Sequence, residues 1–154
     1  MKRYLIAVVM TAGLLTGACG DSETAADDGG NTEAASAGEL VWFENDFDAA
    51  AAQAESSGKP LLIDMYADWC GPCRTLSEEY FTSEEMYPVL SSFVLLKIDV
   101  DDPDMAQYAQ TYNVSSIPCV VIAEADGTEI DRIVGTTPTV AGYVTALEGI
   151  LRQI

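Results

Sequence analysis

Two cysteines three positions apart, directly after an apolar run, constrain this chain more than any other feature of its sequence. Residues 61–67 form a largely apolar run of strand length, and residues 70–73, Cys-Gly-Pro-Cys, open the helical stretch that follows it. Such a run is typical of a strand that is covered on both faces. We therefore predict a strand, a short turn and a helix, with Cys70 at the amino end of the helix and Cys73 one turn further in.

This placement predicts two unlike thiols. The helix dipole favours negative charge at its amino end, so Cys70 is expected to be exposed, to have a lowered pKa and to act as a nucleophile. Cys73 is expected to be shielded and to resolve a mixed disulfide. Two other interpretations of a close cysteine pair stay open from the residues alone, a structural disulfide and half of a zinc site.

The remaining pattern alternates strands and helices and then changes to a hairpin and a last helix. The folded unit is expected over residues 40–154. This order of elements predicts an α/β fold with a central mixed sheet and helices on both faces. The expected strands are 40–43, 61–67, 93–100, 119–124 and 128–134, the last two joined through 125–127. The expected helices are 47–56 capped by Asp46, 73–80, 82–91 with a capping box of Thr82 and Glu85, one from Asp102 and Pro103 to Asn113, and one from Thr137 and Pro138 to 151.

Charge and composition exclude several classes of function. The chain has 25 acidic and 7 basic residues, a formal net charge of −18 and no histidine. This charge repels phosphate backbones, so nucleic-acid binding is not expected. Without histidine, serine-histidine triads, histidine-activated cysteine proteases and most zinc or copper enzyme sites are excluded. We expect no metal and no cofactor, and chemistry that uses thiols, carboxylates or hydroxyls.

Asp64 lies six positions before Cys70, inside the apolar strand, where a carboxylate is expensive to bury. We expect a raised pKa for this carboxyl group and a role in accepting the proton that Cys73 loses when it attacks. The alternative interpretation is a strand aspartate whose side chain reaches solvent.

Two residues at the start of the strand over 119–124 are further candidates. The Ile117–Pro118 bond is a candidate for a cis peptide that exposes backbone groups beside the sulfurs. Cys119 follows it, either as a third sulfur near the pair that competes for Cys70 or becomes oxidised, or as a buried and inert strand cysteine.

The amino terminus resembles an export signal. A basic start at Lys2 and Arg3 precedes an apolar run over residues 4–15 that is too short to span a bilayer comfortably. Residues 15–19 resemble a bacterial lipobox, so residues 1–18 are expected to be a signal peptide and Cys19 to be lipidated and membrane-anchored. The alternative is cleavage after Ala18 that leaves Cys19 as a free thiol. Residues 19–39 are predicted to be a flexible acidic linker, because residues 20–38 lack aromatic and large aliphatic side chains.

Residues 69–73, Trp-Cys-Gly-Pro-Cys, resemble the active-site signature of thioredoxins. The resemblance covers about residues 40–154 and implies the thioredoxin fold. It implies a thiol:disulfide oxidoreductase with Cys70 and Cys73 as catalytic residues and Gly71 and Pro72 between them. Further positions match the same family. Asp64 matches its buried aspartate, Ala67 its strand-end alanine and Trp69 its site tryptophan. Lys97 matches its central-strand lysine, Pro118 its cis-proline, and Gly127 and Gly135 its two glycines.

Within that family, residues 64–70, 79–82 and 93–100 look most like the C-terminal periplasmic domain of DsbD-type reductases. This implies an extracytoplasmic, periplasmic enzyme that reduces disulfides in exported proteins and takes electrons from a membrane thiol carrier of the DsbD type. A disulfide oxidant or isomerase and a non-catalytic binding module are the alternatives. The absence of a visible helical insertion or dimerisation segment disfavours the oxidant or isomerase. We expect a monomer. Cys119, where threonine is usual, and Arg74, where lysine is commoner, depart from the family pattern.

Overall fold

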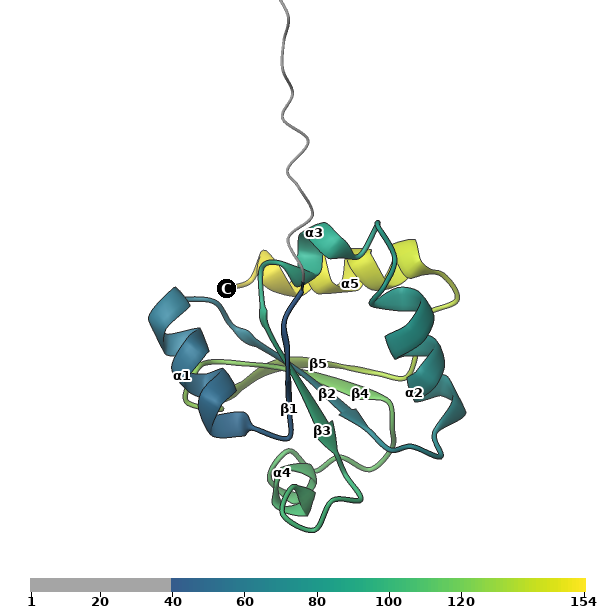
Figure 1. Ribbon diagram of the computed structural model, residues 1–154. Helices are drawn as coiled ribbons and strands as arrows, with labels where there is room; N and C mark the ends of the chain where they lie inside the picture. The colour runs from purple at the N-terminus through teal and green to yellow at the C-terminus, as the bar shows by residue number, and fades with distance from the viewer. Residues whose placement is uncertain (1–39) are drawn as a thin grey trace, which may run out of the picture. The chain divides into compact units, whose positions relative to one another are not determined.

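The computed structural model describes residues 40–154, so the predicted signal peptide, Cys19 and the linker lie outside the described residues. A sheet of five strands in the order β1-β3-β2-β4-β5 forms the centre of this part of the chain (Figure 1). The strands are β1 (Trp42–Glu44), β2 (Leu61–Tyr66), β3 (Val94–Asp99), β4 (Cys119–Ala123) and β5 (Glu129–Val134).

The sheet is mixed, as predicted. Strands β1 and β2 pair with β3 in parallel, whereas β4 runs antiparallel to both β2 and β5. Asp64 in β2 is therefore flanked by Lys97 in β3 and Val120 in β4. The edges are β1, which has only three residues, and β5, whose side chains are exposed or half-buried.

Helices cover both faces of the sheet. They are α1 (Phe47–Ser57), α2 (Gly71–Thr75) with its π-helical continuation η1 (Leu76–Tyr80), α3 (Tyr87–Leu90), α4 (Ala106–Thr111) and α5 (Val140–Leu151). Figure 1 shows α3 and α5 on one side of the sheet and α4 on the other. No helix within residues 40–154 has the length and apolar character needed to cross a membrane.

Two apolar clusters fill the space between the sheet and its helices. In the first, Leu62 and Val120 pack with side chains from α3, α5 and η1, among them Tyr143. In the second, Ile63 and Cys119 pack with side chains from α1 and the end of α4. Because successive side chains of a strand point to opposite faces, Asp64 lies on the face of the first cluster and Cys119 on the face of the second.

The helix predicted over residues 82–91 is wrong in its start and its cap. The Thr82 hydroxyl donates to the Glu78 carbonyl at 2.6 Å and so belongs to the end of the preceding helix. Ser83 is the residue that accepts a backbone N–H, from Met86 at 3.3 Å. The chain continues in turns until α3 begins at Tyr87.

Two other helices begin later than predicted. The Asp102 carboxylate accepts the N–H of Asp104 at 2.9 Å and forms a turn, so α4 begins only at Ala106. Thr139, rather than Thr137, caps α5 by accepting the N–H of Gly142 at 3.1 Å. Nearby polar side chains offer the backbone alternative hydrogen bonds, which is why these boundaries move by a few residues.

The predicted limits of the first helix and the hairpin are confirmed. Asp46 caps α1 by accepting the N–H of Ala49 at 3.0 Å, and Gly58 ends it with a φ of 66°. Gly127 turns the hairpin between β4 and β5 with a φ of 85°, and a Cβ there would lie 3.0 Å from the Phe47 ring. Only glycine adopts such a φ without strain, so this turn requires it.

Candidate active site

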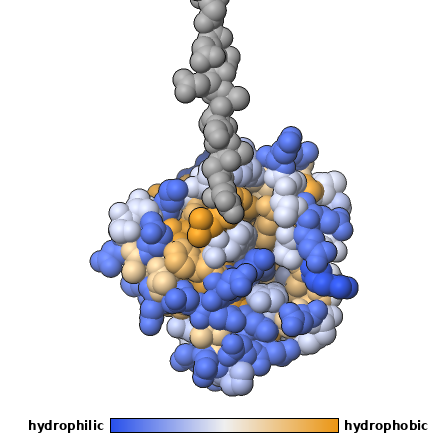
Figure 2. All heavy atoms as spheres, viewed as in Figure 1, coloured by the Kyte–Doolittle hydropathy of each residue, from blue (hydrophilic) through white to orange (hydrophobic). Residues whose placement is uncertain are grey.

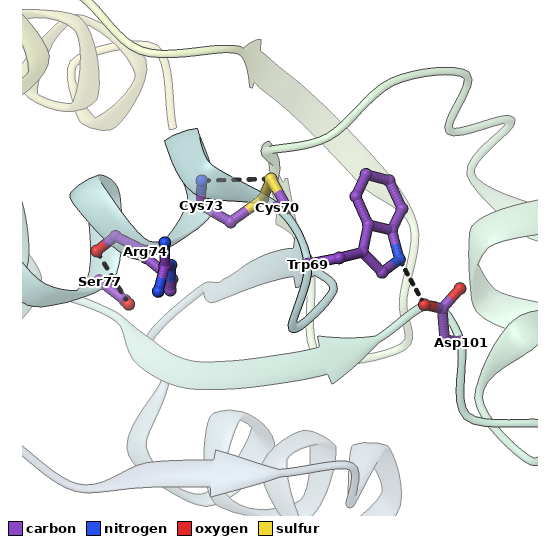
Figure 3. The surroundings of a disulfide bond; sticks show 6 residues. All are labelled: Trp69, Cys70, Cys73, Arg74, Ser77 and Asp101. Carbon is purple, nitrogen blue, oxygen red and sulfur yellow. Dashed lines mark hydrogen bonds between the residues drawn. A yellow bond between two sulfur atoms is a disulfide. The ribbon is translucent and has the colours of Figure 1, made fainter.

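Cys70 and Cys73 form a disulfide at the amino end of α2, just after β2 ends (Figure 3). Their Cα atoms are 5.3 Å apart, and Cys70 Sγ accepts the backbone N–H of Cys73 at 3.2 Å. No group of three or more histidine, cysteine, aspartate and glutamate side chains in residues 40–154 is arranged to hold a metal ion. Because the two sulfurs are bonded to each other, the geometry favours redox exchange between them over the zinc half-site.

The expected difference in exposure between the two thiols is absent from this disulfide form. Cys70 is 4% exposed and Cys73 is 2% exposed. The prediction that Cys70 is exposed is wrong for the oxidised protein, because its sulfur is bonded to Cys73 and accepts a hydrogen bond from the same residue.

Asp64 is buried behind the disulfide, with 1% of its surface exposed. This overturns the interpretation in which its side chain reaches solvent. Burial raises the pKa of Asp64 from 3.8 to about 7, because the carboxylate loses its hydration, and the positive charge of Lys97 opposes this rise. Asp64 can therefore gain or lose a proton near neutral pH.

One cavity of about 240 Å³ joins Asp64 to the site. Cys73 and Asp64 both line it. Its charged lining residues are Glu44, Asp68, Arg74, Glu78 and Lys97. Water in such a cavity can carry a proton between Cys73 and Asp64, so the two side chains need not touch.

Lys97 is held beside Asp64 by the sheet. The two residues are register partners on neighbouring parallel strands. The Lys97 ammonium group lies 5.1 Å from the centroid of the Trp42 ring, and Glu44 is its partner on β1. The positive charge of Lys97 acts on the Asp64 carboxylate and opposes the rise of its pKa.

Pro118 stands at the same end of the sheet as the disulfide. The Ile117–Pro118 peptide bond is cis, as the sequence interpretation allowed. Met65, near the end of β2, pairs with Cys119 at the start of β4, which places Pro118 beside the turn that leads to Cys70. The Pro118 carbonyl accepts the N–H of Gly135 at 2.8 Å.

Trp69 is not packed into the site, since it is 72% exposed. Its indole Nε1 donates to Asp101 Oδ2 at 2.6 Å (Figure 3). Trp69 also lines a second cavity, of about 520 Å³, with Val114 and Ile117. The sequence analysis missed Asp101; the signal that could have found it is the acidic turn after β3, which the sheet order places next to the end of β2.

Comparisons with known proteins agree with this geometry. A family model described as thioredoxin-like matches residues 42–125. A thioredoxin H-type of Oryza sativa subsp. indica is 36% identical over 92 residues, which are 60% of this chain and 70% of that protein. The chain belongs to the thioredoxin-like family.

DsbD proteins are also among the relatives of this chain. The thiol:disulfide interchange protein DsbD of Cronobacter sakazakii is 36% identical over 112 residues, which are 70% of this chain and 19% of that protein. The chain thus spans about a fifth of the length of that relative. The reduced C-terminal domain of Neisseria meningitidis DsbD has a similar fold, with a TM-score of 0.59 and 22% identity over 70% of this chain and 98% of that domain. The chain is a thiol:disulfide oxidoreductase of the thioredoxin-like family.

Cys119 is a free cysteine within the described residues. It is buried in the second cluster, on the face of the sheet opposite α2. Burial raises the pKa of its thiol, and the charge of Arg132 opposes this rise. Of the two interpretations offered by the sequence, the geometry favours a buried core thiol over a third reactive sulfur.

Proposed function

We propose that this chain is an extracytoplasmic reductase that transfers electrons from a membrane thiol carrier of the DsbD type to disulfides in exported proteins. The observation that supports it best is the Cys70–Cys73 disulfide at a helix amino end, sharing one cavity with the buried Asp64. The similarity to DsbD proteins supports the electron donor and the compartment.

In the reduced enzyme, Cys70 loses its proton and its thiolate attacks a substrate disulfide. A bond forms between Cys70 Sγ and one substrate sulfur, and the other substrate sulfur leaves as a thiolate and takes a proton from water. The Cys73 thiolate then attacks Cys70 Sγ, and the second substrate sulfur leaves and is protonated. Two electrons and two protons pass to the substrate, and the enzyme ends as the disulfide seen here.

Asp64 serves the second of these attacks. Cys73 is buried and must be deprotonated to attack, and Asp64 faces the same cavity. With a pKa of about 7, the Asp64 carboxylate is a base matched to neutral pH. We propose that Asp64 accepts the Cys73 proton. We also propose that Pro118, Trp69 and Lys97 position the substrate and the Asp64 carboxyl group around the two sulfurs.

The surroundings of Cys70 support the proposed direction of electron flow. Gly71 and Pro72, which separate the two cysteines, supply no cation. In the neighbouring cavity, the acids Glu44, Asp68 and Glu78 outnumber the cations Arg74 and Lys97, and this balance disfavours a further negative charge. The thiolate of Cys70 is therefore only modestly stabilised, which favours a potential near the roughly −270 mV of thioredoxin over the roughly −120 mV of DsbA.

Two measurements test the proposed reaction. Reduction of insulin by the dithiol form is expected, and a chain without turnover would be a binding module. Equilibration with glutathione is expected to give a potential near about −270 mV, and a value above about −170 mV would identify an oxidant or isomerase.

The anchor is a separate part of the proposal. We propose that residues 1–18 are removed on export and that Cys19 carries lipid, which holds residues 40–154 near a bacterial membrane. Cys19→Ala should release the protein into the soluble exported fraction. An unmodified amino terminus at Cys19, seen by mass spectrometry, would contradict the anchor without affecting the proposed chemistry.

A further inference from the structure

The cavity of about 520 Å³ that Trp69 lines, the Trp69 cavity, offers an apolar surface next to the disulfide. Trp69 directly precedes Cys70, and Ile117, which also lines the cavity, directly precedes the cis bond to Pro118. The other apolar lining residues are Val100, Ala109 and Val114. A substrate segment that brings a disulfide to Cys70 therefore has an apolar surface within reach of its neighbouring side chains.

The Trp69 ring is the exposed part of this surface. It is 72% exposed, although tryptophan is highly buried on average. The hydrogen bond from its indole N–H to Asp101 holds the ring without covering it (Figure 3). A large aromatic face that is fixed and uncovered is typical of a surface to which another protein binds.

The chain around the Trp69 cavity is acidic. Residues 99–118, which run from the end of β3 to the start of β4 and supply most of the lining, contain four aspartates and no lysine or arginine. Asp99 and Asp101 flank the lining residue Val100, and Asp68 precedes Trp69. Figure 2 shows mostly hydrophilic residues around α4, which belongs to this segment. The carboxylates of Asp68, Asp99 and Asp101 thus form an acidic rim beside the apolar surface.

Tyr66 also reports negative charge at this end of the sheet. Burial raises the pKa of Tyr66, and the negative charges of Asp99, Glu44 and Asp68 raise it further. Two acids of the rim therefore act on one phenol group. Their charges lie close enough together to act jointly on a molecule that docks there.

The cations of the described residues lie elsewhere. Arg74 and Lys97 line the cavity behind the disulfide, whereas no described lysine or arginine lines the Trp69 cavity. The other described cations are Lys59, Arg132 and Arg152, of which the two arginines are ion-paired with glutamates. A lysine or arginine of a partner would therefore meet carboxylates beside Trp69 and no cation in the lining of the cavity.

We propose that the Trp69 cavity and its acidic rim select substrates in which the disulfide is flanked by an apolar side chain and by lysine or arginine. This inference rests on the proposed function, because it names the class of protein segment that the same two sulfurs reduce. The apolar side chain covers the Trp69 ring, and the cations lie against the carboxylates of the rim. Such attraction mainly speeds encounter, so the preference is expected in the rate at which Cys70 attacks.

Three disulfide-bonded peptides of one length test this preference with the full chain in its dithiol form. The first has leucine beside its cysteine and lysines around them, the second has glutamates in place of the lysines, and the third has serine in place of the leucine. At about 0.01 M salt the first should be reduced at least about tenfold faster than the second, and the difference should nearly vanish at about 1 M salt, which screens exposed charges. The first should also react about fivefold faster than the third, because one leucine becomes partly buried.

Two variants separate the charge of the rim from the overall charge of the chain. Asp101→Asn removes one carboxylate of the rim but keeps an oxygen that can accept the Trp69 indole N–H. It should lower the ratio of the lysine-peptide rate to the glutamate-peptide rate by about threefold. Glu124→Gln removes the same charge just after β4 ends, in the lining of a different cavity, and should leave this ratio unchanged.

Equal rates for the lysine and glutamate peptides, or an equal fall of the ratio in both variants, would overturn the inference while the proposed reduction stands. If no peptide is reduced, the proposed function fails and binding decides the inference. The same peptides with serine in place of cysteine are then added to the oxidised protein, and the NMR signal of the Trp69 indole N–H is followed. The lysine peptide should shift this signal at a lower concentration than the glutamate peptide, and equal titrations would overturn the inference.

Discussion

The face of the sheet under α2 and α5 buries the carboxyl group of Asp64, whereas the face under α1 and α4 buries the thiol of Cys119. Burial raises the pKa of both groups. For the carboxyl group, this moves the titration toward neutral pH, where proton transfer is useful. For the thiol, it reduces the fraction of reactive thiolate. The same loss of hydration thus brings the pKa of the carboxyl group toward neutral pH and takes the pKa of the thiol further from it.

The largest expected effect is on the face that carries the disulfide. Cys70→Ser should abolish disulfide reduction, because no thiolate remains to attack the substrate. Cys73→Ser should attack once and stay linked to its substrate, which a gel without reducing agent would show. Equal residual turnover in the two variants would contradict the assignment of attacking and resolving cysteines.

Asp64→Asn should change how stability depends on pH. The pKa of Asp64 is raised from 3.8 to about 7 in the folded protein, so its contribution is fully present below about pH 4 and is lost as pH rises through 7. Over this range the wild type should lose up to about 4 kcal/mol of unfolding free energy that the variant keeps.

Urea unfolding of the oxidised proteins at pH 4 and pH 8 checks this difference. The variant should also reduce substrates more slowly near neutral pH, because it lacks the proposed proton acceptor. Parallel pH dependences of stability in the two proteins would show that Asp64 titrates as an ordinary exposed carboxyl group.

A change to the opposite face should affect stability alone. Cys119→Ala removes a buried sulfur and should cost about 1 kcal/mol of unfolding free energy, with turnover unchanged. In the folded, oxidised wild type, a thiol reagent should modify Cys119 only after denaturation. Rapid labelling of the folded protein would show that Cys119 is reactive, which would contradict the contrast between a reactive face and an unreactive one.

The smallest expected effect lies outside both faces, at Asp101. Asp101→Ala should free the Trp69 indole and raise KM for a protein substrate by less than about fivefold, since one hydrogen bond to a charged group is lost at an exposed position. The titration of Asp64 should be unchanged. A large fall in kcat would mean that Asp101 takes part in the chemistry of the buried groups.

Features set by local sequence were predictable. The apolar run of β2, the turn with Cys70 and the hairpin at Gly127 follow from short-range patterns, and the structure has each of them. Burial of Asp64 was also predictable, because a strand that is apolar on both sides of it leaves little access to solvent.

Partners distant in sequence were not predictable. Trp69 bonds Asp101 across 32 positions, and Tyr143 enters the cluster beside Asp64 from the last helix. Only the packing of the sheet brings these groups together. The low exposure of Cys70 was missed because the prediction considered a free thiol, whereas the structure holds a disulfide.

The edges of the sheet bear on how copies of the chain behave when crowded. An edge strand offers unpaired backbone groups to another strand, and charged side chains or a short length discourage such pairing. Strand β5 carries Glu129, Asp131 and Arg132, with Glu129 and Arg132 ion-paired, and β1 has only three residues. Both edge strands are thus poor templates for strand addition. This property protects against aggregation wherever the protein is concentrated.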